Sequence, residues 1–448
     1  MKICIIPIDN RPVCYNLLND LASIDSDIEL MLPPREYLGD LYKIADVDKL
    51  FDWFKTLDDV DKIIISLDTI AYGGLIPSRR SNDNEDVIKE RLVRFKNEWV
   101  KKQAKVLAFS SVMRISNNNY NEEEKEYWKD YGKKIFEFSY NTHKSVIDGV
   151  KPPMSDFPME ILADYKFTRN RNFNINKMYL EWQKFGIFDE LVFSKDDCAQ
   201  FGFNVQEANE LCDNGAKVIT GADEIPIALF ARAIEKELTV CPIFIEDDYK
   251  GLISNYEDVS IEHSVLNQLN LAGVKIANEE NADLILYVNN FKESQGEIVM
   301  KKDTEPFSGS MSFPDRPYMI ADVRFANGAD NCFIKEILPK LDCDNFYGYS
   351  GWNTSANTLG TVICTAKIRF NALKYSDINF KKAQMIRFID DWAYQANIRQ
   401  NIDSVQDITE KMLPYEKIIS KFLDINLQNN YTFPWNRLFE VEVIDELS

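Results

Sequence analysis

Short apolar runs alternate with amphipathic segments over residues 1–250 of the chain. The runs lack the strict alternation of a half-exposed strand, so they are typical of parallel strands that are covered on both faces. The amphipathic segments between them predict helices. In 84–101, for example, Ile88, Leu92, Phe95 and Trp99 share one face at helical spacing. The predicted strands are residues 3–8, 28–32, 63–67, 106–110, 191–194, 218–220 and 240–245.

A second long helix is predicted over residues 122–139, where Trp128, Tyr131, Ile135 and Phe138 form the apolar stripe. Asn121 is its predicted N-cap. Three glutamates would then occupy the first turn, where the helix dipole favours negative charge. From about residue 353 onward, helical patterns dominate the chain.

This order of elements predicts an α/β fold. Seven strand–helix steps favour a (β/α)8-like barrel with residues 284–288 as the eighth strand, and a doubly wound parallel sheet is the alternative. Further strands are predicted at 319–323 and 345–349, and the polar stretch 292–314 predicts a long loop or lid. We therefore expect a catalytic α/β domain, a second α/β region and a helical C-terminal region, over residues 1–248, 249–352 and 353–448.

The composition narrows the class of protein. Apolar residues make up 45% of the 448, enough for a large core, and the net charge of −20 would repel nucleic acids and anionic membranes. No run approaches the ~18 apolar residues of a membrane-spanning helix. The first apolar run breaks at Asp9, before a signal peptide could form. The eight cysteines include no CxxC pair, so we expect reduced thiols in a cytoplasmic protein.

Histidine is scarce, because His143 and His263 are the only two in the chain. They are far apart and outside any nucleophile or ligand motif, which argues against a Ser-His-Asp triad, a multi-histidine zinc site or a haem site. If the chain is an enzyme, carboxyl groups are expected to carry its proton transfers. No cofactor is expected under this hypothesis.

Polar side chains cluster directly behind the predicted strands. Sites in parallel α/β folds form at the carboxyl ends of strands. These positions hold carboxylates, arginines, an aromatic ring and a glycine turn. We therefore expect the candidate site to include Asp9, Asn10, Arg11, Arg35, Asp68, Tyr72, Gly73, Arg114, Asp196, Asp197, Asp223 and Glu224.

The adjacent pair Asp196-Asp197 is the strongest candidate for catalysis. Neighbouring side chains at a strand end point in different directions, so one carboxylate can face a ligand while the other orients it. Like charges close together also raise one pKa, which lets a carboxyl group keep its proton near neutral pH. The alternative is that one Asp caps a helix that begins near Val205. Asp223 is likewise either a helix start signal or a ligand contact.

The other strand-end residues also have two interpretations each. Asp68 precedes a glycine turn that either lets a ligand approach the backbone or is a purely structural tight turn. Asp9 and Arg11 are either ligand contacts or an ion pair that fixes the first loop. Arg114 would neutralise the acidic groups or clamp a carboxylate or phosphate of the substrate.

Two later segments add amide and aromatic groups. Asn327 begins an Asn-Gly turn, and Asp330 behind it is a possible helix cap as well as a ligand contact. Trp352, Asn353 and Asn357 suit a sugar, since an indole can stack on the apolar face of the ring while amides bind the hydroxyls. The alternative for Trp352 is a core position with its indole N–H satisfied.

Several motifs span most of residues 1–400: PIDNRPV at 7–13, LPPR at 32–35, SLD at 66–68, YGGL at 72–75, DD at 196–197, GADE at 221–224, NGAD at 327–330 and GWNT at 351–354. Through them the chain resembles a bacterial family catalogued as domain of unknown function 4127. That name implies no activity. The family often has a second Asp where this chain has Asn10, so the resemblance does not extend a two-carboxylate role to that loop.

A second, local likeness rests on Asp196-Asp197 alone. A barrel with adjacent aspartates after a central strand is similar to the β-N-acetylhexosaminidases that use substrate-assisted catalysis. The likeness implies that one Asp orients the acetamido group of the substrate and that its neighbour acts as general acid/base.

The leading hypothesis is a carbohydrate-active, glycosidase-like hydrolase that uses paired carboxylates on a small-molecule or oligosaccharide substrate. Asp197 would supply acid/base catalysis, and Asp196 would orient the substrate or its neighbour. Asp68, Asp223 or Glu224 would be the other charged partner.

Two other classes of protein remain open. One is a metal-dependent hydrolase of a phosphate- or carboxylate-bearing small molecule, with Mg²⁺, Mn²⁺ or Ca²⁺ held by Asp9, Asp68, Asp196 and Asp223. The other is a non-catalytic sugar- or metabolite-binding protein. Neither nucleic acid nor membrane is expected as a partner, and the sequence does not give the oligomeric state.

Overall fold

The computed structural model of the chain describes residues 1–196, 199–402, 408–425 and 429–445. The chain forms two compact units. Unit 1 comprises Met1–Asn10, Leu30–Pro226 and Tyr256–Asp258, and unit 2 comprises Arg11–Glu29, Ile227–Asn255 and Val259–Ser448. The boundaries predicted after residues 248 and 352 do not coincide with the boundaries of these units.

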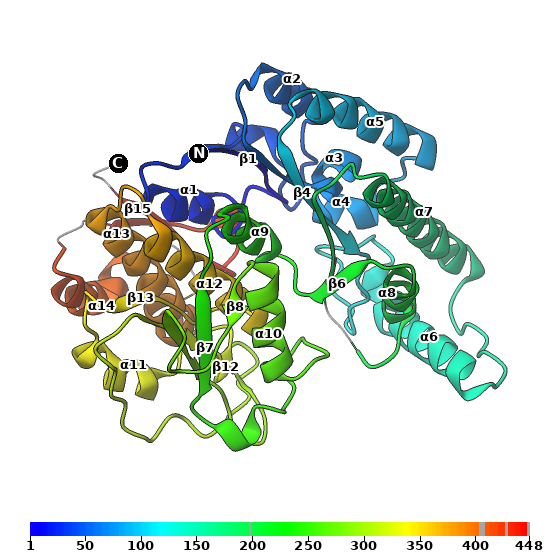
Figure 1. Cartoon of the computed structure of the whole chain (residues 1–448). Coiled ribbons are helices and arrows are strands. Elements are labelled where there is room, and N and C mark those ends of the chain that lie inside the picture. The colour runs from blue at the N-terminus through cyan, green and yellow to red at the C-terminus, as the bar shows by residue number, and fades with distance from the viewer. Residues whose placement is uncertain (197–198, 403–407, 426–428, 446–448) are drawn as a thin grey trace. The chain divides into compact units, whose positions relative to one another are not determined.

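Unit 1 is built on a six-stranded sheet in the order β2-β1-β3-β4-β5-β6 (Figure 1). The registers of β1 with β3, β3 with β4, β4 with β5 and β5 with β6 are all parallel. The middle of β1 is fully buried, from Ile3 to Ile6. The strands are β1 (Lys2–Ile6), β2 (Glu29–Met31), β3 (Lys62–Ser66), β4 (Lys105–Val112), β5 (Glu190–Lys195) and β6 (Lys217–Thr220).

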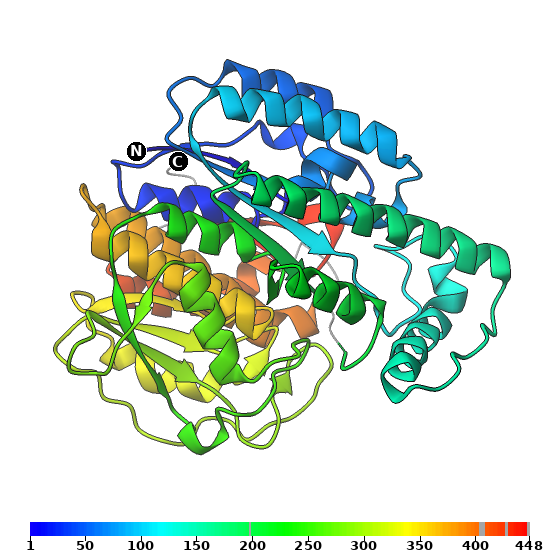
Figure 2. The same cartoon turned by 45° about the vertical axis from the view of Figure 1, so that its right-hand side comes forward.

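Helices flank this sheet, and α7 and α8 pack against β4 and β5 (Figure 2). The apolar stripe predicted on α5 is confirmed, because all four of its residues are buried. The helices of unit 1 are α2 (Val47–Thr56), α3 (Leu67–Tyr72), α4 (Leu75–Arg80), α5 (Glu85–Lys101), α6 (Trp128–Asp148), α7 (Met159–Lys184) and α8 (Phe203–Asp213). The helix α9 (Ile225–Ala233) begins in unit 1 and continues in unit 2.

The predicted start of the second long helix is wrong. The helix α6 begins at Trp128 rather than at residue 122, and Asn121 does not cap it. The carboxylates of Glu123 and Glu124 form ion pairs with Arg114 instead. These ion pairs hold the segment as a loop, which is a tertiary effect that periodicity does not report.

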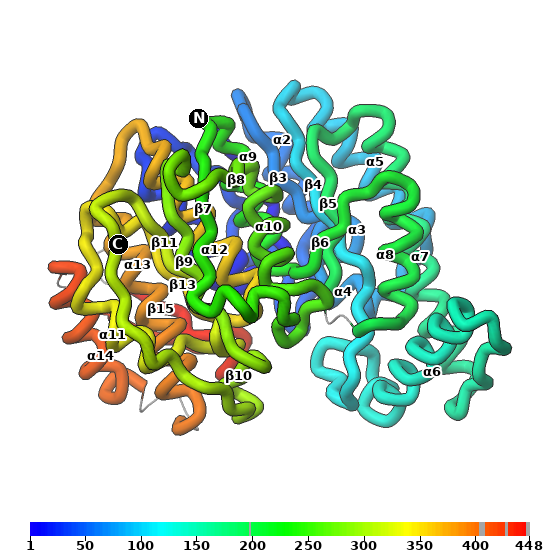
Figure 3. Tube along the Cα trace, turned by 60° about the horizontal axis from the view of Figure 1, so that its bottom comes forward, coloured from blue at the N-terminus to red at the C-terminus, as the bar shows by residue number. Residues whose placement is uncertain are grey.

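Unit 2 has a five-stranded sheet in the order β13-β11-β9-β7-β8, and every pairing in it is parallel (Figure 3). The strands are β7 (Thr239–Phe244), β8 (Lys275–Ile276), β9 (Leu284–Asn289), β11 (Tyr318–Asp322) and β13 (Phe346–Ser350). A short pair of strands, β10 (Gly296–Glu297) and β12 (Phe325–Ala326), lies outside this sheet.

The most buried helix of unit 2 is α12 (Ser355–Asn371), which contacts β11 and β13 and is almost wholly buried from Ser355 to Ile368. The other helices are α1 (Asn16–Ser23), α10 (Ile261–Leu271), α11 (Asn331–Ile337), α13 (Asp377–Arg387), a π-helix over Phe388–Ile398 and α14 (Ile408–Leu423). An antiparallel pair, β14 (Asn429–Thr432) and β15 (Glu442–Asp445), follows them.

The predicted strands are present, but they divide between two sheets. The seventh and eighth predicted strands, β7 and β9, pair with each other in unit 2 and do not extend the first sheet. The described strands therefore form an α/β fold with open parallel sheets and no closed (β/α)8 barrel. A doubly wound arrangement is compatible with both. Counting strand–helix steps could not show this, because a step does not specify which strand is the neighbour.

The two sheets share one strand order. Numbered by appearance within each sheet, both run 2-1-3-4-5, and the first sheet adds a sixth strand. In such a sheet the order reverses between the first and third strands, and ligands commonly bind outside the carboxyl ends of the strands there. The reversal falls between β1 and β3 in unit 1 and between β7 and β9 in unit 2.

Candidate functional site

The carboxyl ends of β5 and β6 lie at the same edge of the sheet in unit 1. Lys195 is in register with Thr220, and the N–H of Gly221 donates to the carbonyl oxygen of Lys195 at 2.8 Å. The residues that follow these strands, Asp196 on one and Asp223 with Glu224 on the other, therefore leave the sheet from adjacent points.

Asp196 is the most exposed carboxylate at this edge, with 31% of its side chain accessible. An Nη of Arg114 lies 3.5 Å from its Oδ2. The helix α8 begins at Phe203 after Gly202 and has no side-chain cap, so Asp196 does not cap it. Capping of α8 is thereby excluded for Asp196. Its neighbour Asp197 lies outside the described residues.

Glu224 is fully buried and folds back over the turn that precedes it. Its Oε2 accepts the N–H of Ala222 at 3.1 Å. Burial is the largest influence on its pKa, and together with the negative charges of Asp223 and Glu257 it raises that pKa to about 8. Glu224 therefore holds a proton at neutral pH. Asp223 beside it is 7% exposed.

A segment from later in the chain, Tyr256–Asp258, completes this acidic edge. The Asp258 carboxylate accepts the hydroxyl of Thr220 at 2.5 Å and forms an ion pair with Lys195, so it binds the ends of both strands. Glu257 next to it is buried. Neither residue was predicted from the sequence, because they follow no predicted strand and nothing local marks their return to the first sheet. We call Asp196, Asp223, Glu224, Glu257 and Asp258 the β5–β6 acidic cluster.

Arg114 links this cluster to two further glutamates. Its Nη2 lies 2.9 Å from Glu123, and its Nε lies 3.2 Å from Glu124. Glu124 also pairs with the buried guanidinium of Arg79 at 2.8 Å. Arg114 thus neutralises acidic groups, which was one of its two predicted roles.

Asp68 lies in the first turn of α3, directly after β3, and its carboxylate contacts β4. Its Oδ2 accepts the backbone N–H of Ser111 at 2.8 Å, and its Oδ1 accepts the hydroxyl of Ser110 at 3.3 Å. Burial raises the pKa of Asp68 to about 6. Gly73 ends α3 with φ = +86°, a left-handed conformation that favours glycine. The glycine turn behind buried Tyr72 therefore has a structural role.

Asp9, Asn10 and Arg35 lie where the strand order of unit 1 reverses. The Nε of Arg35 donates to the carbonyl oxygen of Asn10 at 2.8 Å, and Asp9 is 5% exposed. Arg11 belongs to unit 2, where its guanidinium lies 5.1 Å from the ring centre of Trp435.

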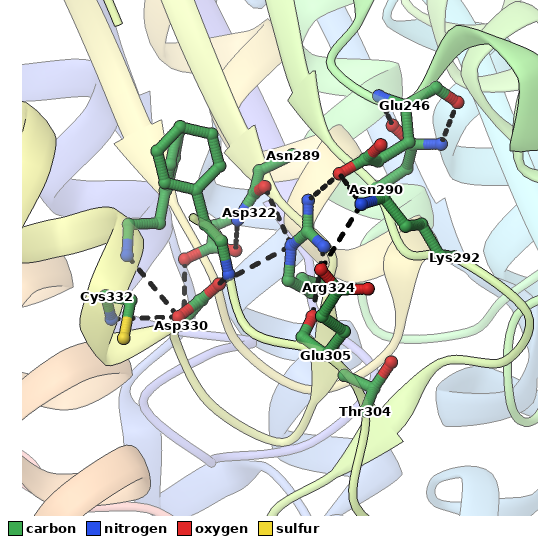
Figure 4. A network of polar contacts seen from close by, with 12 residues as sticks. Glu246, Asn289, Asn290, Lys292, Thr304, Glu305, Asp322, Arg324, Asp330 and Cys332 are labelled. Atoms are coloured by element: carbon green, nitrogen blue, oxygen red, sulfur yellow. Dashed lines mark hydrogen bonds and ion pairs between the residues drawn. The ribbon is translucent and has the colours of Figure 1, made fainter. Parts of the chain in front are cut away.

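The corresponding edge of unit 2 holds a buried polar network (Figure 4). Asp322 ends β11 and accepts bonds from the amide of Asn289 at 2.8 Å and the N–H of Asp330 at 2.9 Å. Burial and the negative charge of Asp330 raise the pKa of Asp322 to about 7. Arg324 donates to Asn289 at 3.1 Å and to Glu246 at 3.0 Å. These buried side chains are held by one another, which is typical of a network that fixes the fold.

The predicted residues of unit 2 have local structural partners. Asp330 is the N-cap of α11, where it accepts the N–H of Cys332 at 2.9 Å. The N–H of Asn327 donates to the carbonyl oxygen of Asn353 at 2.9 Å. Trp352 is 3% exposed and packs on Phe439.

Asn357 lies in the first turn of α12, and its amide donates to Thr354 at 3.1 Å. The predicted site residues are thus divided between the edges of two sheets. Within unit 1, the structure brings Asp196, Asp223 and Glu224 to one edge.

Two kinds of feature are absent from the described residues. No group of three or more His, Cys, Asp or Glu side chains is placed to hold a metal ion there. None of the helices in that part of the chain is long and apolar enough to cross a membrane.

The chain is therefore an α/β protein with two open parallel sheets and an acidic cluster at the edge of the first. A family model described as "Protein of unknown function (DUF4127)" matches residues 3–444, so the chain belongs to this family and the predicted resemblance is confirmed. No curated protein matches the chain. The likeness to the hexosaminidases gains no support from these comparisons.

Proposed function

We propose that the chain is a carbohydrate-active hydrolase that works with the carboxyl groups of the β5–β6 acidic cluster. The observation that carries the proposal is the contrast between Glu224 and Asp196. Glu224 is buried and its pKa is about 8, whereas Asp196 is partly exposed at the neighbouring strand end. A carboxyl group that stays neutral beside ionised neighbours at one edge is an arrangement that active sites use to set the charge around their reacting groups.

Each member of the cluster has a separate role in this proposal. Asp196 and the adjacent Asp197 meet the substrate, with Asp197 as acid/base and Asp196 as the group that orients the substrate or its neighbour. Glu224 is too deeply buried to touch the substrate and is a positioning residue. Its neutral form keeps the total negative charge of the cluster low.

Turnover of a panel of chromogenic aryl glycosides tests the proposal. Asp196→Asn and Asp197→Asn should each lower turnover at least ~10²-fold, as expected for a lost acid/base or substrate-orienting group. Asp52→Asn on the exposed side of α2 is the matched control and should leave turnover unchanged. Equal activity in all four proteins would remove the assignment.

Glu224→Gln separates a positioning role from a merely structural one. Glutamine copies the neutral carboxyl group, so this variant should retain turnover at neutral pH. The wild type should lose turnover as the pH rises through about 8, where Glu224 ionises, and the variant should not. Metal analysis of the purified protein tests the metal-dependent alternative. Stoichiometric Mg²⁺, Mn²⁺ or Ca²⁺, together with an activity that chelators abolish, would favour a metal-dependent hydrolase instead.

A further inference from the structure

Unit 1 contains an open pocket with a volume of about 730 Å³. Its walls come from the loop around Tyr42, the end of α4 at Arg80, the loop from Asn121 to Tyr127 and Asp164 on α7. The volume falls in the range of small-molecule sites, roughly 300–1,000 Å³. None of the site residues predicted from sequence lines it.

Fixed polar contacts hold the walls in place. Arg80 donates to the carbonyl oxygens of Leu41 at 2.8 Å and Glu124 at 3.1 Å, which joins the two loops. Lys125 lies 2.7 Å from Asp164, and the hydroxyl of Tyr127 donates to the same carboxylate at 3.0 Å. The polar lining is therefore preorganised, which lowers the entropic cost of binding a ligand.

The lining favours a polyhydroxylated ligand without negative charge. Tyr42 is 81% exposed and Tyr127 lies on another wall, so aromatic rings are available to the apolar face of a sugar. Asn82 and Asn121 each use one end of the amide within the protein, since Asn121 Nδ2 donates to Glu126 at 3.0 Å and Asn82 Oδ1 accepts from Lys125 at 3.3 Å. The amide nitrogen of Asn82 and the amide oxygen of Asn121 are the groups offered to ligand hydroxyls. Four carboxylates line the pocket against the two cations Arg80 and Lys125, which already bind protein oxygens. Glu124 also pairs with Arg79 and Arg114, and Glu126 pairs with Lys129. Because carboxylates still outnumber cations in the lining itself, a neutral ligand is favoured over an anionic one.

An ion-pair chain connects the pocket with the β5–β6 acidic cluster. Glu124 lines the pocket and lies 3.2 Å from Arg114, whose guanidinium lies 3.5 Å from Asp196. We propose that this pocket binds the end of the saccharide substrate that lies away from Asp196, and that it selects neutral or amino sugars over sugar acids and sugar phosphates. The claim that the bound saccharide is a substrate rests on the proposed function, whereas the binding itself does not.

Binding measured without turnover tests the pocket. The neutral and amino sugars to be tested are maltose, cellobiose and glucosamine, and the anionic ones are glucuronate and glucose 6-phosphate. Calorimetry and saturation-transfer NMR on the full chain measure the binding of each. At least one neutral or amino sugar should bind, and neither anion should bind more tightly than it. Tyr42→Ala should weaken that binding about fivefold, since a stacked ring contributes on the order of 1 kcal/mol.

Tyr120→Ala is the matched control, because Tyr120 is 78% exposed and does not line the pocket. It should leave the Kd unchanged. Asn82→Ala should also weaken binding. Because Asn82 lies outside the loop of Tyr42, this second variant distinguishes a lost ligand contact from a disturbed Tyr42 loop.

Three results would overturn the proposal that this pocket binds a saccharide. They are no binding of any of the five probes, tighter binding of an anion than of every neutral or amino sugar, and equal affinity in the Tyr42 and Tyr120 variants. Sugar binding that Tyr42→Ala weakens, without hydrolysis of any glycoside, would refute the proposed function and leave the pocket standing.

Discussion

The carboxylate of Glu224 occupies the space in which any residue other than glycine at position 221 would place its side chain. A Cβ built on Gly221 would lie 1.6 Å from Oε1 of Glu224, and the backbone there has φ = +126°. Glycine at this position therefore serves two needs, a conformation that other residues rarely adopt and room for a folded-back carboxyl group. The turn after β6 and the burial of Glu224 depend on each other.

Gly221→Ala should therefore destabilise the protein more than a change at another left-handed glycine. We expect a loss of about 2–4 kcal/mol in the free energy of unfolding, from backbone strain together with displacement of Glu224. Gly215→Ala is the control, since Gly215 has φ = +90° but nothing within 4 Å of its Cβ position. Gly215→Ala should lower the free energy of unfolding by only about 1 kcal/mol. Urea titration measures both, and equal losses would show that Glu224 does not occupy this space.

The ionisation of Glu224 should make stability depend on pH. Its folded pKa of about 8 exceeds its ordinary value of 4.5, so the native state binds this proton more tightly than the unfolded state does. The resulting stability is fully present below about pH 4.5 and is lost as the pH rises through about 8, with a slope of at most ~1.4 kcal/mol per pH unit.

Glu224→Gln should remove that slope, so the wild type minus variant difference in unfolding free energy should fall between pH 5 and pH 8. Urea titrations at several pH values measure the difference. Glu90→Gln, at an exposed position of α5, supplies the control and should change nothing. A difference that stays constant with pH would mean that Glu224 titrates normally.

Asp330 offers a test of the cap in unit 2. Its carboxylate accepts the N–H groups of Cys332 at 2.9 Å and Phe307 at 2.7 Å, and it is 1% exposed. Asp330→Ala should lower the free energy of unfolding by about 2–4 kcal/mol, because it removes the cap of α11 and leaves buried N–H donors without an acceptor. Asp330→Asn keeps one acceptor oxygen and should cost clearly less. Thermal and urea unfolding measure both variants. Unfolding free energies equal to that of the wild type in both would contradict this structural role.

Much of the fold could be predicted from apolar runs, because a parallel strand covered on both faces has a distinctive composition. The positions of β1, β3, β9 and β11 were all predicted within a few residues. The division of these strands between two sheets could not be predicted, because the strand after α9 has the same local pattern whichever sheet it joins. The start of α6 was missed for a related reason, since Glu123 and Glu124 form ion pairs with an arginine outside the segment.

The candidate site was predictable where strand order alone decides position. Asp196, Asp223 and Glu224 follow two strands that proved to be neighbours. Glu257 and Asp258 were not predictable, since their place at this edge comes from a segment that returns from beyond β7. The pocket beside Tyr42 was also missed, because its lining comes from loops without a sequence motif.

Turnover of the aryl glycoside panel by Asp196→Asn, compared with Asp52→Asn, decides whether the β5–β6 acidic cluster catalyses hydrolysis. We expect hydrolysis by the wild type and by Asp52→Asn, a decrease of at least ~10²-fold for Asp196→Asn, and the same unfolding free energy for all three. Wild-type turnover in the Asp196→Asn variant, or no hydrolysis of any glycoside by the wild type, would contradict this catalytic role.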